Sequence, residues 1–502
     1  MHRKTLVGGS ACIIAHLIFG VALVGQTSVL LNAQESIETP TSKVERKNKA
    51  PLSRDVLRVK LPRPVEAKLT NGLTVLILED HRTPSIFVQL HIGGAGALFE
   101  PPDMIGLANV TAQMLREGTQ SRTSVQIAEE IDRLGATLGA DGSFGSSKVV
   151  LNASGLSDNF DSWFTLAVDV LLNPSFPREE LEKLKQRLRA QLRQQRSVPN
   201  FLVNERFNRA VYRDHPAAIV SPTTESLDAL THEALVQWHR GRYAPQNALL
   251  AIAGDVRPQE LIPQLEKWFA AWQRSDVKRT WPPSPVAATS RKAYLVHRPN
   301  SVQTTVALGN IAIDRRSPDY IPMVVMNHIL GGGVSGRLFL NLREEKGYTY
   351  GVYSSFSALR YPGPWRAGGN MRTEVTAGAL VEFFKEIGRI RYQTVPSAEL
   401  EDSKRAIAAR FALSLEQPTA ILGLAVSRVQ FRLPDDYWDT YPAKIMAVTA
   451  EDVQRVARKY LDPDTMQLVV VGDGLKIQSV LEPYGPVDVY DSSGKLTSIP
   501  KQ

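Results

Sequence analysis

Two stretches of the chain share one layout: THEALVQWHRGRYAPQNALLAIAGD at residues 231–255 and TAEDVQRVARKYLDPDTMQLVVVGD at residues 449–473. In each, a threonine precedes a helix-like segment, a tyrosine and a proline follow it, and an apolar run ends at Gly-Asp. The threonine and the glycine are 23 residues apart in both copies, and the copies are offset by 218 residues. A repeat at this period indicates two tandem domains of one fold, each of about 220 residues. The alternative is a chance similarity between two helix–strand units.

The start of the first repeat predicts strands. Asn71-Gly72 separates two apolar runs at residues 65–70 and 73–78, and this dipeptide is the strongest short-range signal for a hairpin. A further strand is predicted over residues 86–92. Each half therefore opens with strands, passes through helices and closes with a helix and a strand. This order predicts an α+β fold, in which each domain is a largely antiparallel sheet with helices packed on one face.

A proline-rich segment at residues 275–292 divides the halves. Its sequence Trp-Pro-Pro-Ser-Pro at 281–285 cannot continue a helix or an inner strand. We therefore predict an N-terminal domain over residues 59–274, a linker over 275–292 and a C-terminal domain over 293–490. The polar residues 34–58 predict a flexible spacer ahead of the first domain.

The N-terminus has the pattern of an export signal. A positive stretch, His2-Arg3-Lys4, precedes an apolar stretch that runs to about Leu31, and Ala33 offers a small residue for cleavage. We predict a signal peptide over residues 1–33 and a location in the bacterial periplasm. The alternative is an uncleaved inner-membrane anchor, because the apolar stretch is nearly long enough to span a bilayer. Contact with a membrane is expected only in that case.

Cysteine and charge exclude several functional classes. The single cysteine, Cys12, lies in the leader, so the mature chain has no disulfide and no catalytic thiol. A lipid attached to Cys12 is disfavoured because almost no apolar run precedes it. The net charge is +8, but the basic residues alternate with acidic ones, as at residues 178–196, which is typical of a solvated helix face. We therefore predict no nucleic-acid partner.

One helix-like segment points to a family of enzymes. Residues 106–119 read GLANVTAQMLREGT, between Glu-Pro-Pro at 100–102 and Ser-Arg-Thr at 121–123. The segment resembles the zinc-binding helix of the insulinase/pitrilysin family of metallopeptidases, the inverted zincins, and the resemblance extends over residues 65–473. In that family the helix carries His-x-x-Glu-His: two histidines one turn apart bind zinc, and the glutamate activates the zinc-bound water.

In this sequence the resemblance fails at the metal site. The positions of the two histidines and the glutamate are occupied by Asn109, Gln113 and Ala112, and the family's distal glutamate aligns with Gln191 to within one residue. Amides are poor zinc ligands, and alanine cannot accept a proton. The resemblance therefore implies a degenerate zinc site, and we predict no metal and no cofactor in this chain.

The histidines offer no replacement for that site. No two of the nine stand three or four residues apart. His232 and His239 are seven apart, which places them on one helix face but about 10 Å from each other, too far to share a metal. We expect these histidines to have structural or surface roles.

The second half carries another motif that is similar to the family. Residues 330–339, LGGGVSGRLF, lead into residues 342–351, LREEKGYTYG. The glycines permit positive φ and close backbone approach, and a helix is predicted after them. In related peptidases an Arg–Tyr pair seven residues apart projects from this element toward the zinc site, and Arg343 and Tyr350 keep that spacing. The alternative is a solvated arginine and a packed tyrosine. Arg337 is a neighbouring candidate, for which we expect a structural role.

The resemblance implies a divided enzyme. In a processing-peptidase-like branch of the family, one subunit carries the zinc motif, and the other lacks it but supplies substrate contacts. We therefore expect a non-catalytic subunit of a heterodimeric zinc endopeptidase, paired with a homologous zinc-carrying subunit. Arg343 and Tyr350 would act on the zinc site of the partner, and a peptide or unfolded protein would bind as an added strand at a sheet edge.

Two other functions remain open from the sequence. One is a catalytically silent peptide-binding or scaffold protein, since core subunits of the respiratory cytochrome complex resemble the family in this way. The other is an autonomous peptidase with an unorthodox metal site.

Overall fold

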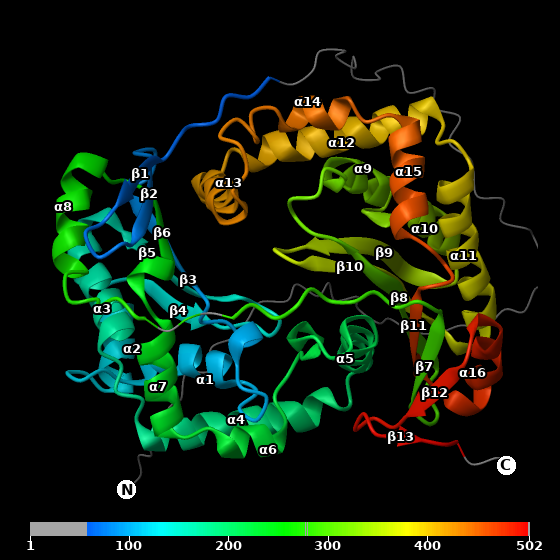
Figure 1. The fold of residues 1–502 in the computed structure, drawn as a ribbon, viewed down its shortest axis with the longest axis horizontal. Coiled ribbons are helices and arrows are strands. Elements are labelled where there is room, and N and C mark those ends of the chain that lie inside the picture. The colour runs from blue at the N-terminus through cyan, green and yellow to red at the C-terminus, as the bar shows by residue number, and fades with distance from the viewer. Residues whose placement is uncertain (1–57, 277, 279, 500–502) are drawn as a thin grey trace, which may run out of the picture. The chain divides into compact units, whose positions relative to one another are not determined.

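In the computed structural model (Figure 1), which describes residues 58–276, 278 and 280–499, each repeat forms a helix and a central strand of one of two α+β halves. The side chains of Thr231 and Thr449 accept hydrogen bonds from the backbone and cap the helices α7 (His232–Arg242) and α15 (Ala450–Tyr460). Every residue of the strands that follow, β6 and β11, is buried. The predicted signal peptide and nearly all of the predicted spacer lie outside the described residues.

The first sheet has six strands in the order β1-β2-β6-β3-β5-β4. β2 and β6 are parallel, and the other neighbours are antiparallel. The predicted Asn-Gly hairpin joins β1 to β2, with Gly72 at a φ of 94°, where a side chain would be strained. The strands are β1 (Val65–Lys68), β2 (Thr74–Glu79), β3 (Ser85–Gly93), β4 (Thr137–Asp141), β5 (Lys148–Leu156) and β6 (Ala248–Gly254).

The second sheet has seven strands in the order β13-β12-β7-β11-β8-β10-β9. β7 is parallel to both β11 and β12, and the remaining pairs are antiparallel. The prediction of an α+β fold with two similar, largely antiparallel sheets is confirmed. The strands are β7 (Lys292–His297), β8 (Gln303–Ile313), β9 (Thr349–Ala358), β10 (Pro362–Arg372), β11 (Gln467–Gly472), β12 (Val487–Tyr490) and β13 (Leu496–Thr497).

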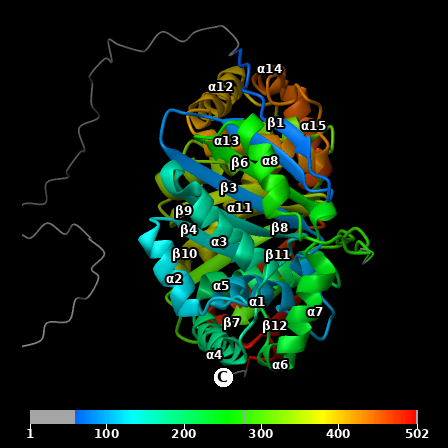
Figure 2. The ribbon, with the colours of Figure 1, turned by 90° about the vertical axis from the view of Figure 1, so that its left-hand side faces the viewer.

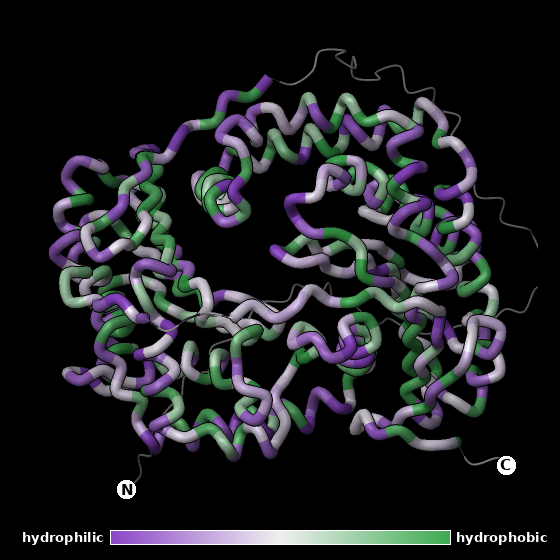
Figure 3. The backbone as a smooth tube through the Cα atoms, viewed as in Figure 1, coloured by the Kyte–Doolittle hydropathy of each residue, from purple (hydrophilic) through white to green (hydrophobic). Residues whose placement is uncertain are grey.

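Amphipathic helices cover the sheets (Figure 2), and hydrophilic and hydrophobic residues alternate along α12 and α15 (Figure 3). Along the part of the chain that the structure describes, no helix has both the length and the apolar character needed to cross a bilayer. Beside α7, the first half has α1 (Leu107–Met114), α2 (Ser124–Arg133), α3 (Phe160–Leu172), α4 (Arg178–Gln195), α5 (Pro199–Tyr212), α6 (Thr224–Ala229) and α8 (Pro258–Trp268). Beside α15, the second half has α9 (Tyr320–Gly331), α10 (Arg337–Phe339), α11 (Thr376–Tyr392), α12 (Ser397–Ser414), α13 (Pro418–Phe431), α14 (Tyr441–Met446) and α16 (Gly474–Leu481).

The helices α5 and α13 occupy matching positions in the two halves. Each begins with a proline, and the two prolines are 219 residues apart (418 − 199). Each helix is followed by an arginine with a φ of 53°, Arg213 or Arg432. The repeat therefore extends beyond the two stretches that first indicated it.

The halves exchange these two helices. α5 packs against β8 and β11 of the second sheet, and α13 packs against β2 and β6 of the first (Figure 1). Leu422 of α13 is 1% exposed in an apolar cluster with Leu76 and Leu249 of the first sheet. Because each sheet needs a helix from the other half to cover its second face, the two halves form one cooperative unit.

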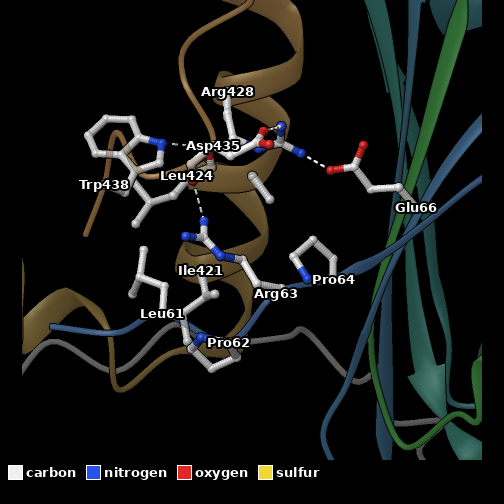
Figure 4. Close-up of a pocket in the computed structure, with 11 residues that line it drawn as sticks. Leu61, Pro62, Arg63, Pro64, Glu66, Ile421, Leu424, Arg428, Asp435 and Trp438 are labelled. Atoms are coloured by element: carbon white, nitrogen blue, oxygen red, sulfur yellow. Dashed lines mark hydrogen bonds and ion pairs between the residues drawn. The ribbon is translucent and has the colours of Figure 1, made fainter. Parts of the chain in front are cut away.

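The segment that enters β1 adds a polar connection between the halves (Figure 4). The backbone N–H of Leu61 donates to Asp439 Oδ1 over 3.1 Å, and Arg63 pairs with the same carboxylate. Arg428 of α13 pairs with Glu66 of β1. The first described residues of the chain are thus held by residues of the second half.

Candidate functional site

The zinc-helix equivalent is α1, and Glu100 holds its N-terminus. The Glu100 carboxylate accepts hydrogen bonds from the backbone N–H groups of Gly106 over 2.9 Å and Ala108 over 2.6 Å. Burial raises the pKa of Glu100 to about 7, and the two N–H donors oppose that shift. Glu-Pro-Pro at 100–102 therefore supplies the cap that positions α1.

The positions of the zinc ligands are occupied by a closed amide pair. Gln113 Nε2 donates to Asn109 Oδ1 over 2.7 Å, one turn away on α1. Ala112, at the position of the general base, is 1% exposed and packs in the core of the first half. The helix thus keeps its place in the fold, while the two amides at the ligand positions bond to each other.

The structure does not bring Gln191 into this site. Gln191 lies on an exposed part of α4 and is absent from the residues that line the cavity at Asn109. That cavity, of about 490 Å³, lies between the end of β4 and α5, with Asp141 on one side and Asn204 and Asn208 on the other. Of the four predicted degenerate positions, only Asn109 and Gln113 interact directly through their side chains.

The residues present do not fit a zinc ion. Within residues 58–276, 278 and 280–499, no three His, Cys, Asp or Glu side chains are grouped closely enough to hold a metal. His232 Nδ1 donates to the Phe176 carbonyl and His239 Nε2 to the Leu171 carbonyl, each over 2.8 Å. These two histidines have structural roles, as expected from their spacing.

In the glycine-rich motif of the second half, the glycines have negative φ, and Gly331 lies close to the backbone of a neighbouring strand. Gly332 and Gly336 have φ values of −74° and −72°. A Cβ on Gly331 would lie 2.7 Å from the backbone N of Ser354 in β9. Of the two properties expected of these glycines, the close backbone approach is observed, because Gly331 allows α9 to contact the sheet; none of them adopts positive φ.

Arg343 is presented by an irregular helix after this motif. The π-helical segment Leu340–Glu345 carries it, and its guanidinium lies 4.8 Å from the ring centroid of Phe339. Its side chain is 45% exposed, and its Nε lies 3.6 Å from Glu344 Oε1. A helix with this wider turn is frequent at functional sites.

Tyr350 follows on β9 and is 90% exposed. Gly347, with a φ of 63°, ends the helical segment and turns the chain into the strand. An exposure of this size excludes the alternative in which Tyr350 packs at the helix–strand junction. Arg343 and Tyr350 are thus both exposed to solvent, on two consecutive elements of the second half.

Arg337 is structural, as the sequence suggested. Its guanidinium is buried and makes two hydrogen bonds of 2.7 Å to the carboxylate of Glu399 on α12. The pair holds the motif against the helical layer.

The two parts of the site meet at α5. Tyr350 lines a cavity of about 440 Å³ that also contacts Asn200, at the start of α5, and Arg366 of β10. Arg366 Nη1 donates to Asn204 Oδ1 over 2.9 Å, and Asn204 lines the cavity at Asn109. Sequence reasoning missed Arg366 and Asn204. The alternation of β10 would have placed Arg366 opposite the buried Trp365, but nothing in the sequence indicates that α5 covers that face.

The fold and the site together define a class: a two-domain protein of the zinc-metallopeptidase type whose metal helix has lost its ligands. Two family models match the chain, Insulinase (Peptidase family M16) over residues 74–222 and the Peptidase M16 inactive domain over residues 229–407. The chain therefore belongs to peptidase family M16, the insulinase family, and is a catalytically inactive relative within it.

Similar proteins agree with this assignment. A Bacillus subtilis protein named uncharacterized zinc protease YmxG is 24% identical over 78% of this chain and 95% of its own length. A Helicobacter pylori protein named non-peptidase homolog YmxG is 23% identical over 80% of this chain and 92% of its own. The crystal structure of a peptidase M16 inactive domain from Pseudomonas fluorescens matches with a TM-score of 0.75 and 27% identity, covering 82% of this chain and 97% of that one.

Proposed function

We propose that this chain is the non-catalytic subunit of a heterodimeric M16 zinc endopeptidase. The observation that carries the proposal is the accessibility of Arg343 and Tyr350 in a chain whose zinc helix has lost its ligands. The match of residues 229–407 to the inactive domain of the family supports a partner from the same family. That partner would hold the zinc, and this chain would supply two hydrogen-bond donors.

The two donors suit amide hydrolysis. When water attacks a peptide carbonyl, negative charge develops on its oxygen, and a guanidinium or a phenol can donate a hydrogen bond to it. One such donor contributes typically about 2–4 kcal/mol of transition-state stabilisation. Arg343 and Tyr350 would stabilise that charge at the zinc site of the partner.

The sheet edge supports the peptide-binding part of the proposal. β4 is the last strand of the first sheet, and it ends at Asp141, which lines the cavity at Asn109. An edge strand presents unpaired backbone N–H and C=O groups. A peptide or unfolded segment would pair with β4 through these groups, with little demand on its sequence.

We further propose that the chain is exported to the bacterial periplasm, because the leader predicted over residues 1–33 has the order of a signal peptide. Fractionation of cells that express the full chain would place it, and recovery from the cytoplasm would contradict this part of the proposal.

The deciding experiment uses the complex of this chain with a two-domain homologue that retains His-x-x-Glu-His. Arg343→Ala and Tyr350→Phe should each lower kcat/KM for a quenched fluorescent peptide by about 100-fold. Arg257→Ala and Tyr392→Phe are matched controls, because both side chains are exposed on helices of other regions. Unchanged turnover in the first pair would exclude the proposed role.

The same preparation tests the alternatives. Peptide binding without partner-dependent cleavage would indicate a catalytically silent binding protein. Stoichiometric zinc in the isolated chain, with chelator-sensitive cleavage, would indicate an autonomous peptidase.

A further inference from the structure

Two adjoining cavities lie where the start of α5 meets the open face of the second sheet. One, of about 440 Å³, includes Tyr350 and Arg366, and the other, of about 470 Å³, includes Arg298. Asn200, Gln303, Thr305 and Asn370 line both. The shared lining makes them two parts of one depression beside Tyr350.

The only charged side chains that line the depression in the described chain are the two arginines, Arg298 and Arg366. In the described chain, none of the residues that line either cavity is an aspartate, a glutamate or a lysine. The lining consists of two arginines, several amides and hydroxyls, glycine backbone and a few apolar side chains. Such a surface offers many hydrogen-bond donors and no anion to neutralise the arginines.

Arg366 is a cation without a carboxylate partner. Its guanidinium donates to the neutral amide of Asn204 and lies 5.1 Å from the ring centroid of Phe207. Among the described residues, no carboxylate lies within ion-pair distance of Arg366, and burial lowers the pKa of Arg366. By contrast, the buried Arg337 is paired with the carboxylate of Glu399. A partly desolvated guanidinium gains most from an anion that arrives with a ligand.

The register of the strands gives the distance from Tyr350. Arg366 of β10 lies opposite Ser355 of β9, five positions from Tyr350. At about 3.3 Å a residue this is roughly 16 Å, and the arginine side chain shortens it. A group some three to five residues from a peptide bond at Tyr350 would reach Arg366.

We infer that this depression is a subsite for a carboxylate of the bound peptide, with Arg366 as its main ligand and Arg298 at its far end. The inference rests on the proposed function, which makes a peptide the ligand. The carboxylate comes from an acidic side chain or from the C-terminus of the peptide. Arg366 would then set a preference for acidic over neutral substrates, whereas Arg343 and Tyr350 act at the bond itself.

The test uses the isolated full chain and fluorescein-labelled decapeptides. One peptide has a central Glu and an amidated C-terminus, a second has Gln in place of Glu, and a third has Gln with a free C-terminal carboxylate. Fluorescence anisotropy at low salt should show that one or both carboxylate peptides bind about tenfold more tightly than the neutral one. Tighter binding of the Glu peptide would identify an acidic side chain as the source of the carboxylate, and tighter binding of the peptide with the free C-terminus would identify the terminal carboxylate.

Variants then assign the preference to Arg366. Arg366→Gln should abolish it, Arg366→Lys should retain part of it because the charge remains without the planar fork, and Arg257→Gln should leave it unchanged. Thermal unfolding of each variant confirms that it is folded, and the comparison of peptides on the unaltered chain needs no variant. Equal binding of all three peptides, no binding of any of them, or a preference that survives Arg366→Gln would overturn the inference.

This readout is separate from catalysis. It needs neither the partner nor turnover, so an inactive heterodimer would leave the charge preference measurable. In turn, a missing preference would leave the test of Arg343 and Tyr350 intact.

Discussion

The zinc-helix region and the Arg343–Tyr350 element differ in how their polar side chains are used. On α1, Gln113 and Asn109 bond to each other, and Ala112 lies in the core. On the second element, Tyr350 is 90% exposed, and Arg343 is nearly half exposed. The first region has become ordinary structure, while the second presents groups that the fold itself does not need. Substitutions on α1 should therefore change stability, whereas substitutions at Arg343 and Tyr350 should change activity and leave stability almost unaltered.

The largest effect is expected from restoring the general base alone. Ala112→Glu would place a carboxyl at a site that is 1% exposed, at a cost of about 3 kcal/mol in the free energy of unfolding. Urea denaturation would measure it, with Asn109→Glu on the same helix as the control, because that side chain is partly exposed. Equal and small changes in the free energy of unfolding of both variants would mean that position 112 still accommodates a carboxyl group.

A second, smaller effect concerns pH. Since burial raises the folded-state pKa of Glu100 to about 7, the folded chain binds a proton that the unfolded chain has released above its ordinary value of 4.5. This contribution to stability is fully present below pH 4.5 and is lost as the pH rises through 7, and it amounts to at most about 3 kcal/mol. The buried His91, whose pKa burial lowers to about 3, changes stability in the opposite direction below its ordinary value of 6.5.

The variant Glu100→Gln isolates the effect of Glu100. Its free energy of unfolding relative to the unaltered chain should improve between pH 5 and pH 7 and level off at higher pH. Chemical denaturation at four or five pH values would measure this difference, in which the contribution of His91 cancels. A difference that stays constant with pH would show that the folded-state pKa of Glu100 is not raised.

The smallest effect is expected at the other region. Arg343→Ala and Tyr350→Phe should change the free energy of unfolding by about 1 kcal/mol or less, because Tyr350 is 90% exposed and Arg343 loses only its contact with the Phe339 ring and its pairing with Glu344. Thermal unfolding of the isolated chain would measure this, and the same variants serve in the heterodimer assay. A loss of several kcal/mol would assign these residues to the fold instead.

The sequence predicted the parts of the fold that depend on local rules. Asn71-Gly72 specified a hairpin through its turn geometry, and the threonines at 231 and 449 specified helix starts through their caps. The exchange of α5 and α13 was not predictable in this way, because an amphipathic pattern shows that a face is buried but not which sheet buries it.

The candidate site was predictable to a similar degree. The motif spacing indicated Arg343 and Tyr350, and the structure places both within reach of solvent. Arg366 and Asn204 were missed because they meet across α5, 162 positions apart in the chain. The glycine run suggested positive φ or close backbone approach, and only the fold shows that the strand β9 beside Gly331 requires the second.

The exchange of α5 and α13 also has a consequence for synthesis. The first sheet is complete at Gly254, but the helix that covers its second face ends only at Phe431, 177 residues later (431 − 254). At about 5–20 residues per second, a ribosome needs roughly 10–35 s for that stretch. During that interval Leu76, Leu78 and Leu249 have no cover from their own chain. A copy that folds during synthesis therefore exposes this apolar surface until α13 has been made, and an exposed surface of this kind favours aggregation.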